Sequence, residues 1–326
     1  MMLIDCLLIV VGIVMVLRGA DLLTEGAAAL ARRMNISEIV IGLTIVAAGT
    51  SAPELFVSVV SALNGTPDLA VGNVVGSNIM NTLLIVGVTA MVTPIAVSRS
   101  TVGKDMPFTA AATLLLALLC TDGQASLSLR GHTISRMDGT LLLAVFAIFM
   151  LYTFAVTRPS GDTPDEAADS AGRQPVPVWK SLLFVAIGLA LLIFGSNLFV
   201  DSATTVAAVL GVSQSVIGLT IVAGGTSLPE LATSVVAARK GQSAIAIGNV
   251  IGSNVFNILL ILGLTATISP MEIEGITIVD MATMLMSIVV LWLFSFTKFK
   301  VERWEGAVLT LGYSAYLAWL LYQATR

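Results

Sequence analysis

The chain contains one stretch twice. Residues 42–90 reappear as residues 218–266 at a constant offset of 176 positions, without a gap, and 31 of the 49 aligned positions are identical. Of these identities, 17 are Gly, Pro or polar, so a shared bias toward apolar residues cannot explain them. Each copy carries a glutamate, Glu54 or Glu230, in the middle of an apolar run. A duplicated membrane segment with a central carboxylate is typical of a transporter.

The composition indicates a membrane protein. Of the 326 residues, 56% are hydrophobic and only 11% are charged, whereas a soluble domain carries about 25% charged residues. We therefore expect a polytopic protein whose surroundings are a lipid bilayer. The net charge of −4 and the lack of a basic stripe argue against a nucleic-acid partner, and the sequence indicates no protein partner. No Ser/Lys pair, paired aspartates or HExxH motif is present, so we predict no enzymatic activity and no cofactor.

Hydrophobicity predicts the number of spans and their orientation. A span needs about 20 mostly apolar residues, and ten segments qualify: 3–30, 36–63, 67–95, 105–121, 138–157, 179–206, 213–238, 242–267, 278–297 and 305–323. With this topology, 12 of the 16 Lys and Arg residues fall on one side and 3 on the other. Because basic loops stay in the cytoplasm, we predict a multi-pass protein of the cell (inner) membrane with both termini outside.

A polar linker divides the chain into two halves. Residues 158–178 are rich in Pro, Asp and Ser and predict a flexible cytoplasmic linker. It joins a first half, residues 1–157 with repeat 42–90, to a second half, residues 179–326 with repeat 218–266. Each half has five predicted spans, and an odd number means that the halves insert in opposite directions. The expected fold is therefore all-α, with ten transmembrane helices arranged as two inverted five-helix repeats.

The two glutamates are the main candidates for a binding site. A charged carboxylate at the bilayer centre costs roughly 2.5–3.5 kcal/mol on insertion scales. Neither apolar run offers a Lys or Arg partner at that depth. Glu54 and Glu230 should therefore face a cavity, a cation or a proton.

The residues before each glutamate add oxygen ligands. The pattern is Gly-Thr-Ser-x-Pro-Glu, and the proline, Pro53 or Pro229, has no N–H. We expect this to leave the carbonyl of Gly49 or Gly225 without its helical partner. Hydroxyl groups lie next to it at Thr50, Ser51, Thr226 and Ser227. Oxygen donors of this kind suit calcium, magnesium, manganese or sodium rather than zinc or copper.

The second part of each repeat adds amides and glycines. Ser77 and Asn81 are spaced i, i+4 and share a helix face that can point toward the glutamate-bearing helix, and Ser253 and Asn257 do the same. The paired glycines Gly72/Gly76 and Gly248/Gly252 predict close helix packing. Four more asparagines could be ligands or interhelical links: Asn73, Asn78, Asn249 and Asn254. The two carboxylates match one divalent ion, or a few monovalent ions that replace it.

These motifs resemble the alpha-repeats of the sodium/calcium exchanger family, within the calcium:cation antiporters. The sequence is similar to the short prokaryotic members, with G-T-S-x-P-E followed by G-N-V-x-G-S-N in each half. The resemblance implies a sodium-driven antiporter that transports Ca²⁺ and Na⁺ and typically exports calcium. It also implies that Glu54 and Glu230 are the central ligands. The remaining implied ligands are Thr50, Ser51, Thr226, Ser227, Ser77, Asn81, Ser253 and Asn257, with the backbone carbonyls of Ala47 and Ala223.

One position bears on the branch of the family. Some relatives, notably potassium-dependent ones, carry an aspartate where this chain has Asn257. The amide leans against potassium cotransport and leaves the sodium stoichiometry open. A proton-coupled exchanger of calcium or another divalent cation is the main alternative, because the same glutamates could alternate between calcium and protons. A cation channel could also place carboxylates in mid-membrane, but it would not need two oppositely inserted copies.

Overall fold

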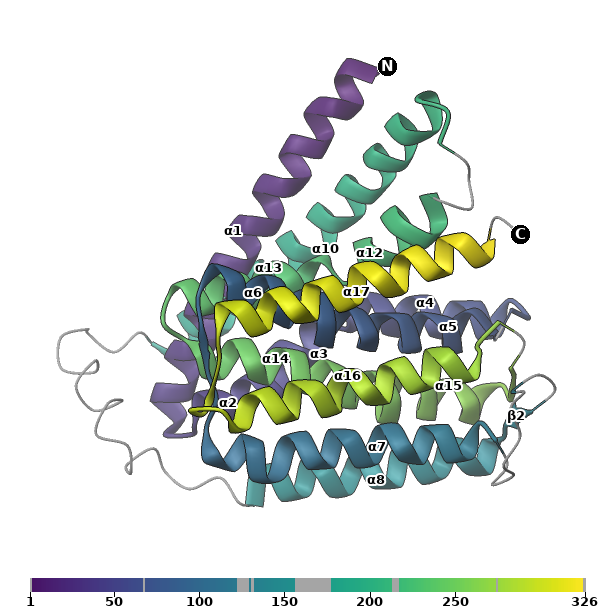
Figure 1. Cartoon of the computed structure of the whole chain (residues 1–326). Coiled ribbons are helices and arrows are strands. Elements are labelled where there is room, and N and C mark those ends of the chain that lie inside the picture. The colour runs from purple at the N-terminus through teal and green to yellow at the C-terminus, as the bar shows by residue number, and fades with distance from the viewer. Residues whose placement is uncertain are drawn as a thin grey trace.

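The computed structural model describes residues 2–66, 68–121, 129, 132–155, 177–212, 217–273 and 275–324, which are mostly helical (Figure 1). The predicted linker lies outside the described residues except for its last two positions. Two of the repeat helices bend and several contain π-helical turns, which are marked η.

The helices of the first half lie at the five segments predicted to span the membrane, and several of them extend up to four residues beyond the predicted ends. They are α1 (Met2–Met34); α2 (Glu38–Ile41), η1 (Gly42–Val46), α3 (Ala47–Thr50) and α4 (Ala52–Leu63); α5 (Asp68–Ile79), η2 (Met80–Ile85) and α6 (Val86–Val92); η3 (Thr101–Asp105) and α7 (Met106–Leu119); and α8 (Arg136–Ala155).

The second half repeats this order. Its helices are α10 (Val178–Val209); η4 (Gly218–Val222), α12 (Ala223–Thr226) and α13 (Leu228–Arg239); α14 (Ser243–Val255), η5 (Phe256–Ile261) and α15 (Leu262–Ile268); α16 (Ile278–Phe296); and α17 (Arg303–Ala324). Among the described residues, seven helices are long and apolar enough to cross a membrane, or nine if each bent pair counts as one span. Helix α17 has 22 residues but is less apolar, so the full count of ten stays a prediction.

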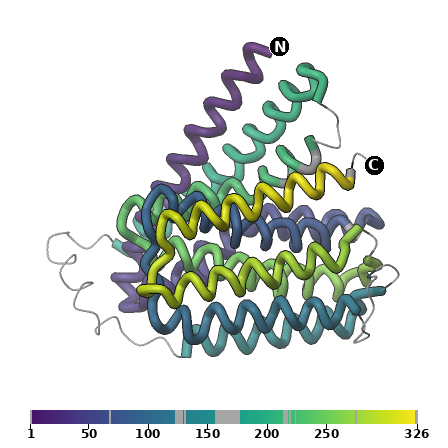
Figure 2. The backbone as a smooth tube through the Cα atoms, viewed as in Figure 1, coloured from purple at the N-terminus to yellow at the C-terminus, as the bar shows by residue number. Residues whose placement is uncertain are grey.

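Glycines join α1 and α10 in an antiparallel pair. A Cβ atom added at Gly12 would lie 2.8 Å from the carbonyl oxygen of Gly195, and one at Gly19 would lie 2.7 Å from that of Gly188. Moving seven residues forward along α1, from Gly12 to Gly19, therefore corresponds to moving seven residues backward along α10, from Gly195 to Gly188. Figures 1 and 2 show these two helices side by side, leaning away from the rest of the bundle. The first helices of the two halves thus run in opposite directions.

Two short strand pairs connect the halves. Strand β1 (Ile95–Ala96) pairs with β4 (Lys300–Val301), and β2 (Thr133–Ile134) pairs with β3 (Met271–Glu272). Both pairs are antiparallel, and each takes one strand from each half. The halves are therefore linked by backbone hydrogen bonds as well as by helix packing.

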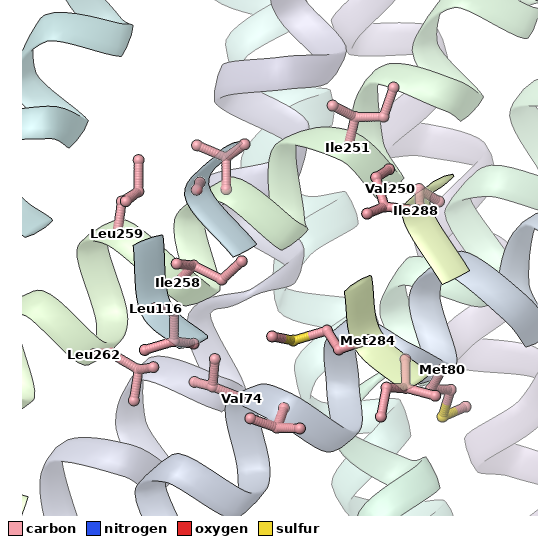
Figure 3. Close-up of a cluster of buried hydrophobic side chains, with 14 of the residues drawn as sticks. Val74, Met80, Leu116, Val250, Ile251, Ile258, Leu259, Leu262, Met284 and Ile288 are labelled. Atoms are coloured by element: carbon pink, nitrogen blue, oxygen red, sulfur yellow. The ribbon is translucent and has the colours of Figure 1, made fainter. Parts of the chain in front are cut away.

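The centre of the bundle is built around α14 and its continuation. Every residue from Ile245 to Val255 is buried, and a helix surrounded on all sides must be apolar or have its polar groups paired. Figure 3 shows part of the hydrophobic cluster that this helix shares with its neighbours, including Val74 of α5, Ile258 of η5 and Met284 of α16. This packing fixes the position of the polar site.

Candidate cation site

Both repeat helices break two residues before the proline of the proline-glutamate pair. Helix α3 ends at Thr50 and α4 begins at Ala52, with Ser51 between them at φ −83° and ψ 5°, and the two segments meet at 46°. Ser227 occupies the same place in the second repeat, at φ −91° and ψ 7°, with a bend of 56°. Each proline lies in the first helical turn, where its missing N–H costs nothing.

The expectation that the proline leaves a carbonyl free is wrong. Backbone N–H groups at the end of α3 donate to the carbonyl oxygens of Ala47 and Gly49, and one at the end of α12 donates to that of Gly225. The bond to Ala47 is the ordinary helical one from Ser51. The carbonyls of Gly49 and Gly225 face a proline four residues on, and they accept an N–H only because the chain bends at the break. The proline therefore bends the helix without creating an unpaired carbonyl at these glycines.

The two glutamates meet in one site, and hydroxyls cross between the repeats. Both carboxylates are 1% exposed. Ser51 Oγ donates to Glu230 Oε1 at 3.1 Å, and Ser227 Oγ donates to Glu54 Oε1 at 3.2 Å. Ser253 Oγ adds a bond to Glu230 Oε1 at 3.4 Å. Each carboxylate is thus held by a serine from the opposite copy, as expected of a single site shared by two repeats.

Four buried oxygens of this site lack a hydrogen-bond partner. They form two equivalent pairs: Glu54 Oε2 with Glu230 Oε2, and Asn81 Oδ1 with Asn257 Oδ1. A buried acceptor without a donor is costly and needs an explanation, such as a bound ion. All four are hard ligands of the type that calcium and sodium prefer. The described residues contain no cluster of three His, Cys, Asp or Glu side chains, so neutral oxygens complete this set.

The other predicted ligands lie around these oxygens. Thr50 is fully buried, and its hydroxyl donates to Asn249 Oδ1 at 3.0 Å. The carbonyl of Ala47 accepts the backbone N–H of Ser51 at 3.0 Å, and Ala223 begins α12 at the equivalent place. Ser77 is buried one helical turn before Asn81. Thr226 is partly exposed, and its side chain hydrogen-bonds Glu54.

The four additional asparagines act as interhelical links. Asn73 Nδ2 donates to the backbone carbonyl of Glu54 at 3.3 Å and to Ser58 Oγ at 3.1 Å. Asn249 makes the same two bonds in the second repeat, to Glu230 and Ser234, at the same distances. Asn78 and Asn254 bond across the repeats.

Two features of the site have little or no signal in the sequence. Asn81 and Asn257 lie in the π-helical turns η2 and η5, and such turns are frequent at functional sites. The second such feature is Thr82, whose hydroxyl accepts a hydrogen bond from Asn254. Its one visible mark is that it differs from Ile258 at the equivalent position.

The two repeats are not packed alike around the site. A Cβ added at Gly248 would lie 2.9 Å from Ile39 O, and one at Gly252 would lie 2.7 Å from Leu43 O. Among the described residues, the nearest atom to a Cβ at Gly72 is 3.9 Å away, and nothing lies within 4 Å of one at Gly76. Close packing at the paired glycines is thus confirmed in the second repeat and is wrong for the first. Helix α14 of the second repeat therefore packs closely against α2 and η1, and α5 of the first repeat makes no equally close contact with the described residues.

Comparison with known proteins identifies the family. The family model described as sodium/calcium exchanger protein matches residues 5–155 and 180–322. The chain belongs to the sodium/calcium exchanger family. The match covers most of both halves and leaves out the predicted linker. Members of this family are membrane transporters of sodium and calcium, so the absence of enzymatic function expected from the sequence is confirmed.

Individual relatives match along nearly the whole chain. A putative antiporter, CaxA, of Alkalimonas amylolytica is 39% identical over 97% of this chain and 98% of its own length. The sodium/calcium exchanger MaX1 of Methanosarcina acetivorans is 32% identical over 99% and 100%. The structure of the sodium-calcium exchanger NCX_Mj soaked with 10 mM Na⁺ and zero Ca²⁺ superposes with a TM-score of 0.80, at 30% identity, over 98% of this chain and 99% of that chain.

Proposed function

We propose that this chain is a sodium-driven calcium antiporter that binds its ions at the site between Glu54 and Glu230. The four unpaired oxygens carry the proposal, because two carboxylates and two amides at equivalent positions each bury an oxygen without a hydrogen-bond partner, and the two carboxylates are joined by serines that cross between the repeats. The family and the sodium/calcium exchangers among its relatives support the choice of ions.

The charge of the site explains how the two ions would compete. Two ionised carboxylates match the charge of one calcium ion, which takes about 6–8 oxygen ligands. The unpaired oxygens supply four, and nearby hydroxyls and carbonyls supply the rest. Sodium ions bound to the same carboxylates would displace calcium, so the two could not be carried together. Competition at one site is the basis of exchange.

Alternating access is supported by the unequal packing of the repeats. Gly248 and Gly252 seal one side, while Gly76 is exposed and Thr226 is partly exposed on the other. With the topology that the basic residues predict, the loosely packed side faces the outside of the cell. The present structure would then be the state that exchanges ions with the exterior. Movement of the α1–α10 pair relative to the bundle would open the opposite side.

The architecture proposed for this mechanism is ten spans in two inverted halves. Seven single helices, two bent pairs and α17 supply that number, and the antiparallel contact of α1 with α10 fits opposite insertion. We infer that both termini lie outside the cytoplasmic membrane and that calcium is exported while sodium enters. If three sodium ions replace one calcium ion, each cycle moves one charge, and a membrane potential contributes about 2.3 kcal/mol per 100 mV.

The test is calcium-45 uptake into liposomes that contain the purified protein. Uptake should require sodium inside the vesicles and should fall to the level of empty liposomes in Glu54→Gln and Glu230→Gln. Ser61→Ala, at an exterior turn of α4 away from the carboxylates, serves as a matched control and should transport normally. Uptake that persists in both glutamine variants would refute this site.

An experiment with a proton gradient distinguishes the sodium-driven antiporter from the main alternative, a proton-coupled exchanger. Uptake driven equally well by an outward proton gradient without sodium would identify a proton-coupled exchanger acting at the same carboxylates. Failure of both gradients, with calcium still bound, would refute exchange itself.

A further inference from the structure

A chain of buried hydrogen bonds ends at one of the site amides. The Thr82 hydroxyl donates to the backbone carbonyl of Asn78 at 2.9 Å. Asn254 Nδ2 donates to Thr82 Oγ1 at 2.8 Å, and Asn81 Nδ2 donates to Asn254 Oδ1 at 3.2 Å. The members of this chain are all at most 3% exposed, so water cannot replace a missing partner.

Each link fixes the direction of the next. Because Thr82 gives its single hydrogen to a carbonyl, its oxygen is left to accept from Asn254. Asn254 must then present its oxygen to Asn81, and Asn81 must present its nitrogen to Asn254. The oxygen of Asn81 is thereby turned away from this chain and is one of the four unpaired oxygens of the site. Reversing either amide would place donor against donor or acceptor against acceptor.

The second repeat orients its amide in a different way. Asn257 Nδ2 donates to Asn78 Oδ1 at 3.0 Å, and Asn78 Nδ2 donates directly to the backbone carbonyl of Asn254 at 3.3 Å. No hydroxyl intervenes there, because the position equivalent to Thr82 is Ile258. That side chain lies in the hydrophobic cluster of Figure 3.

We propose that Thr82 is a positioning residue of the cation site, which acts through Asn254 to turn the Asn81 oxygen toward the bound ion. The inference rests on the proposed function, since it concerns the same site. Thr82 would not itself be a ligand, because its hydroxyl is already hydrogen-bonded to Asn78 and Asn254. Its part is to give the Asn254 amide one orientation, which in turn gives Asn81 one orientation.

Removing the hydroxyl should therefore weaken cation binding without unfolding the protein. In Thr82→Val the side chain keeps its shape, but Asn254 Nδ2 loses its acceptor and neither amide orientation is favoured. Asn81 can then turn its nitrogen toward the carboxylates, and calcium must reverse it in order to bind. One hydrogen bond of ordinary strength corresponds to a roughly 3- to 10-fold loss of calcium affinity.

The experiment compares three single variants in two measurements. Calcium affinity is read from the calcium concentration that half-saturates sodium-driven uptake, and independently from the rise in melting temperature that added calcium produces. Thr82→Val should weaken both with little change in maximal rate or in the melting temperature without cations. Thr82→Ser keeps the hydroxyl and should restore affinity. Ile258→Val, the control at the equivalent position, should leave affinity unchanged although it trims the core.

A double-variant cycle tests the route through Asn254. Asn254→Ala should weaken calcium at least as much as Thr82→Val, and combining the two should add nothing further, because the chain is already broken. Additive losses, unchanged affinity in Thr82→Val, or a Thr82→Ser variant as weak as Thr82→Val would each overturn the inference.

The two measurements also separate this inference from the proposed function. If the wild-type protein binds calcium but does not exchange it for sodium, the proposed function fails, and Thr82 is still judged from the melting data. A wild-type protein that binds neither calcium nor sodium refutes both.

Discussion

Replacing Gly19 by alanine tests whether the α1–α10 pair depends on contact between the two backbones. The added Cβ would lie 2.7 Å from the carbonyl oxygen of Gly188 and 2.8 Å from the nitrogen of Leu192, whereas ordinary contact begins at 3.4 Å. Both neighbours are backbone atoms, so neither can turn aside. The helices must separate by the difference, about 0.7 Å, which forfeits a large part of the dispersion energy along their contact.

The loss of stability is measured best relative to a variant at a glycine where an added Cβ atom meets no close neighbour. Overpacking costs about 1–3 kcal/mol, and alanine gains about 1 kcal/mol over glycine in helix propensity. Gly312→Ala in α17 receives the same propensity gain, but its nearest neighbour is a leucine side chain at 3.9 Å. The propensity term cancels between the two variants. Gly19→Ala should therefore be less stable than Gly312→Ala by about 1–3 kcal/mol.

The stability of these variants can be measured through the reactivity of the Cys120 thiol. It is buried, whereas Cys6 is exposed, so a thiol-reactive dye labels Cys6 at once and Cys120 on unfolding. Heating the purified variants with the dye should give a lower midpoint for Gly19→Ala, and sodium-driven calcium uptake should fall with it. Equal midpoints for the two variants would refute the argument that the α1–α10 pair is held by backbone contact.

Three further predictions concern other contacts. Ser227→Ala removes the 3.2 Å bond to Glu54 and should raise the half-saturating calcium concentration several-fold, by about the value of one hydrogen bond; unchanged affinity would contradict the shared-site geometry. Tyr316→Phe removes a 2.7 Å bond to the buried Asp280 carboxylate and should cost about 1.5–3 kcal/mol of stability, read from the same dye assay; a midpoint equal to wild type would show that this bond is replaced. Hydrogen bonds from two neighbouring lysines hold the pKa of Glu302 below its ordinary value, so this contact stabilises the protein at neutral pH and is lost as the pH falls through the lowered pKa. The melting midpoints of wild type and Glu302→Gln should therefore differ at neutral pH and converge in acid; a difference that grows on acidification would contradict that sign.

The glutamates and asparagines that carry the four unpaired oxygens could be named from the sequence, because they occupy equivalent positions in the two repeats. Glu54 and Glu230 stand at equivalent places in apolar runs, and an ion is an economical reason for a carboxylate there. A disturbance of the helix before each glutamate followed from the missing N–H of the proline. The hydrogen bond that the Gly49 carbonyl still accepts could not be predicted, because it depends on how far the chain turns at Ser51, which no local pattern specifies.

Differences between the repeats could not be predicted from their similarity. Gly76 and Gly252 have nearly the same neighbours in sequence, yet one is exposed and the other lies against the backbone of Leu43. The local sequence therefore does not indicate which copy is tightly packed. Thr82 could not be singled out from the sequence, because its proposed role depends on a hydrogen bond from Asn254, which is distant along the chain.

The uncontacted glycines of the first repeat have a consequence for the energetics of switching. Gly72 and Gly76 stand at the positions equivalent to Gly248 and Gly252, but a Cβ at either would meet no described atom closer than 3.9 Å. If the proposed alternating access is correct, the opposite conformation could use the same kind of interface, with the first repeat tightly packed in place of the second. Two similar sequences in a single chain would then supply the close contacts for both ends of the proposed motion.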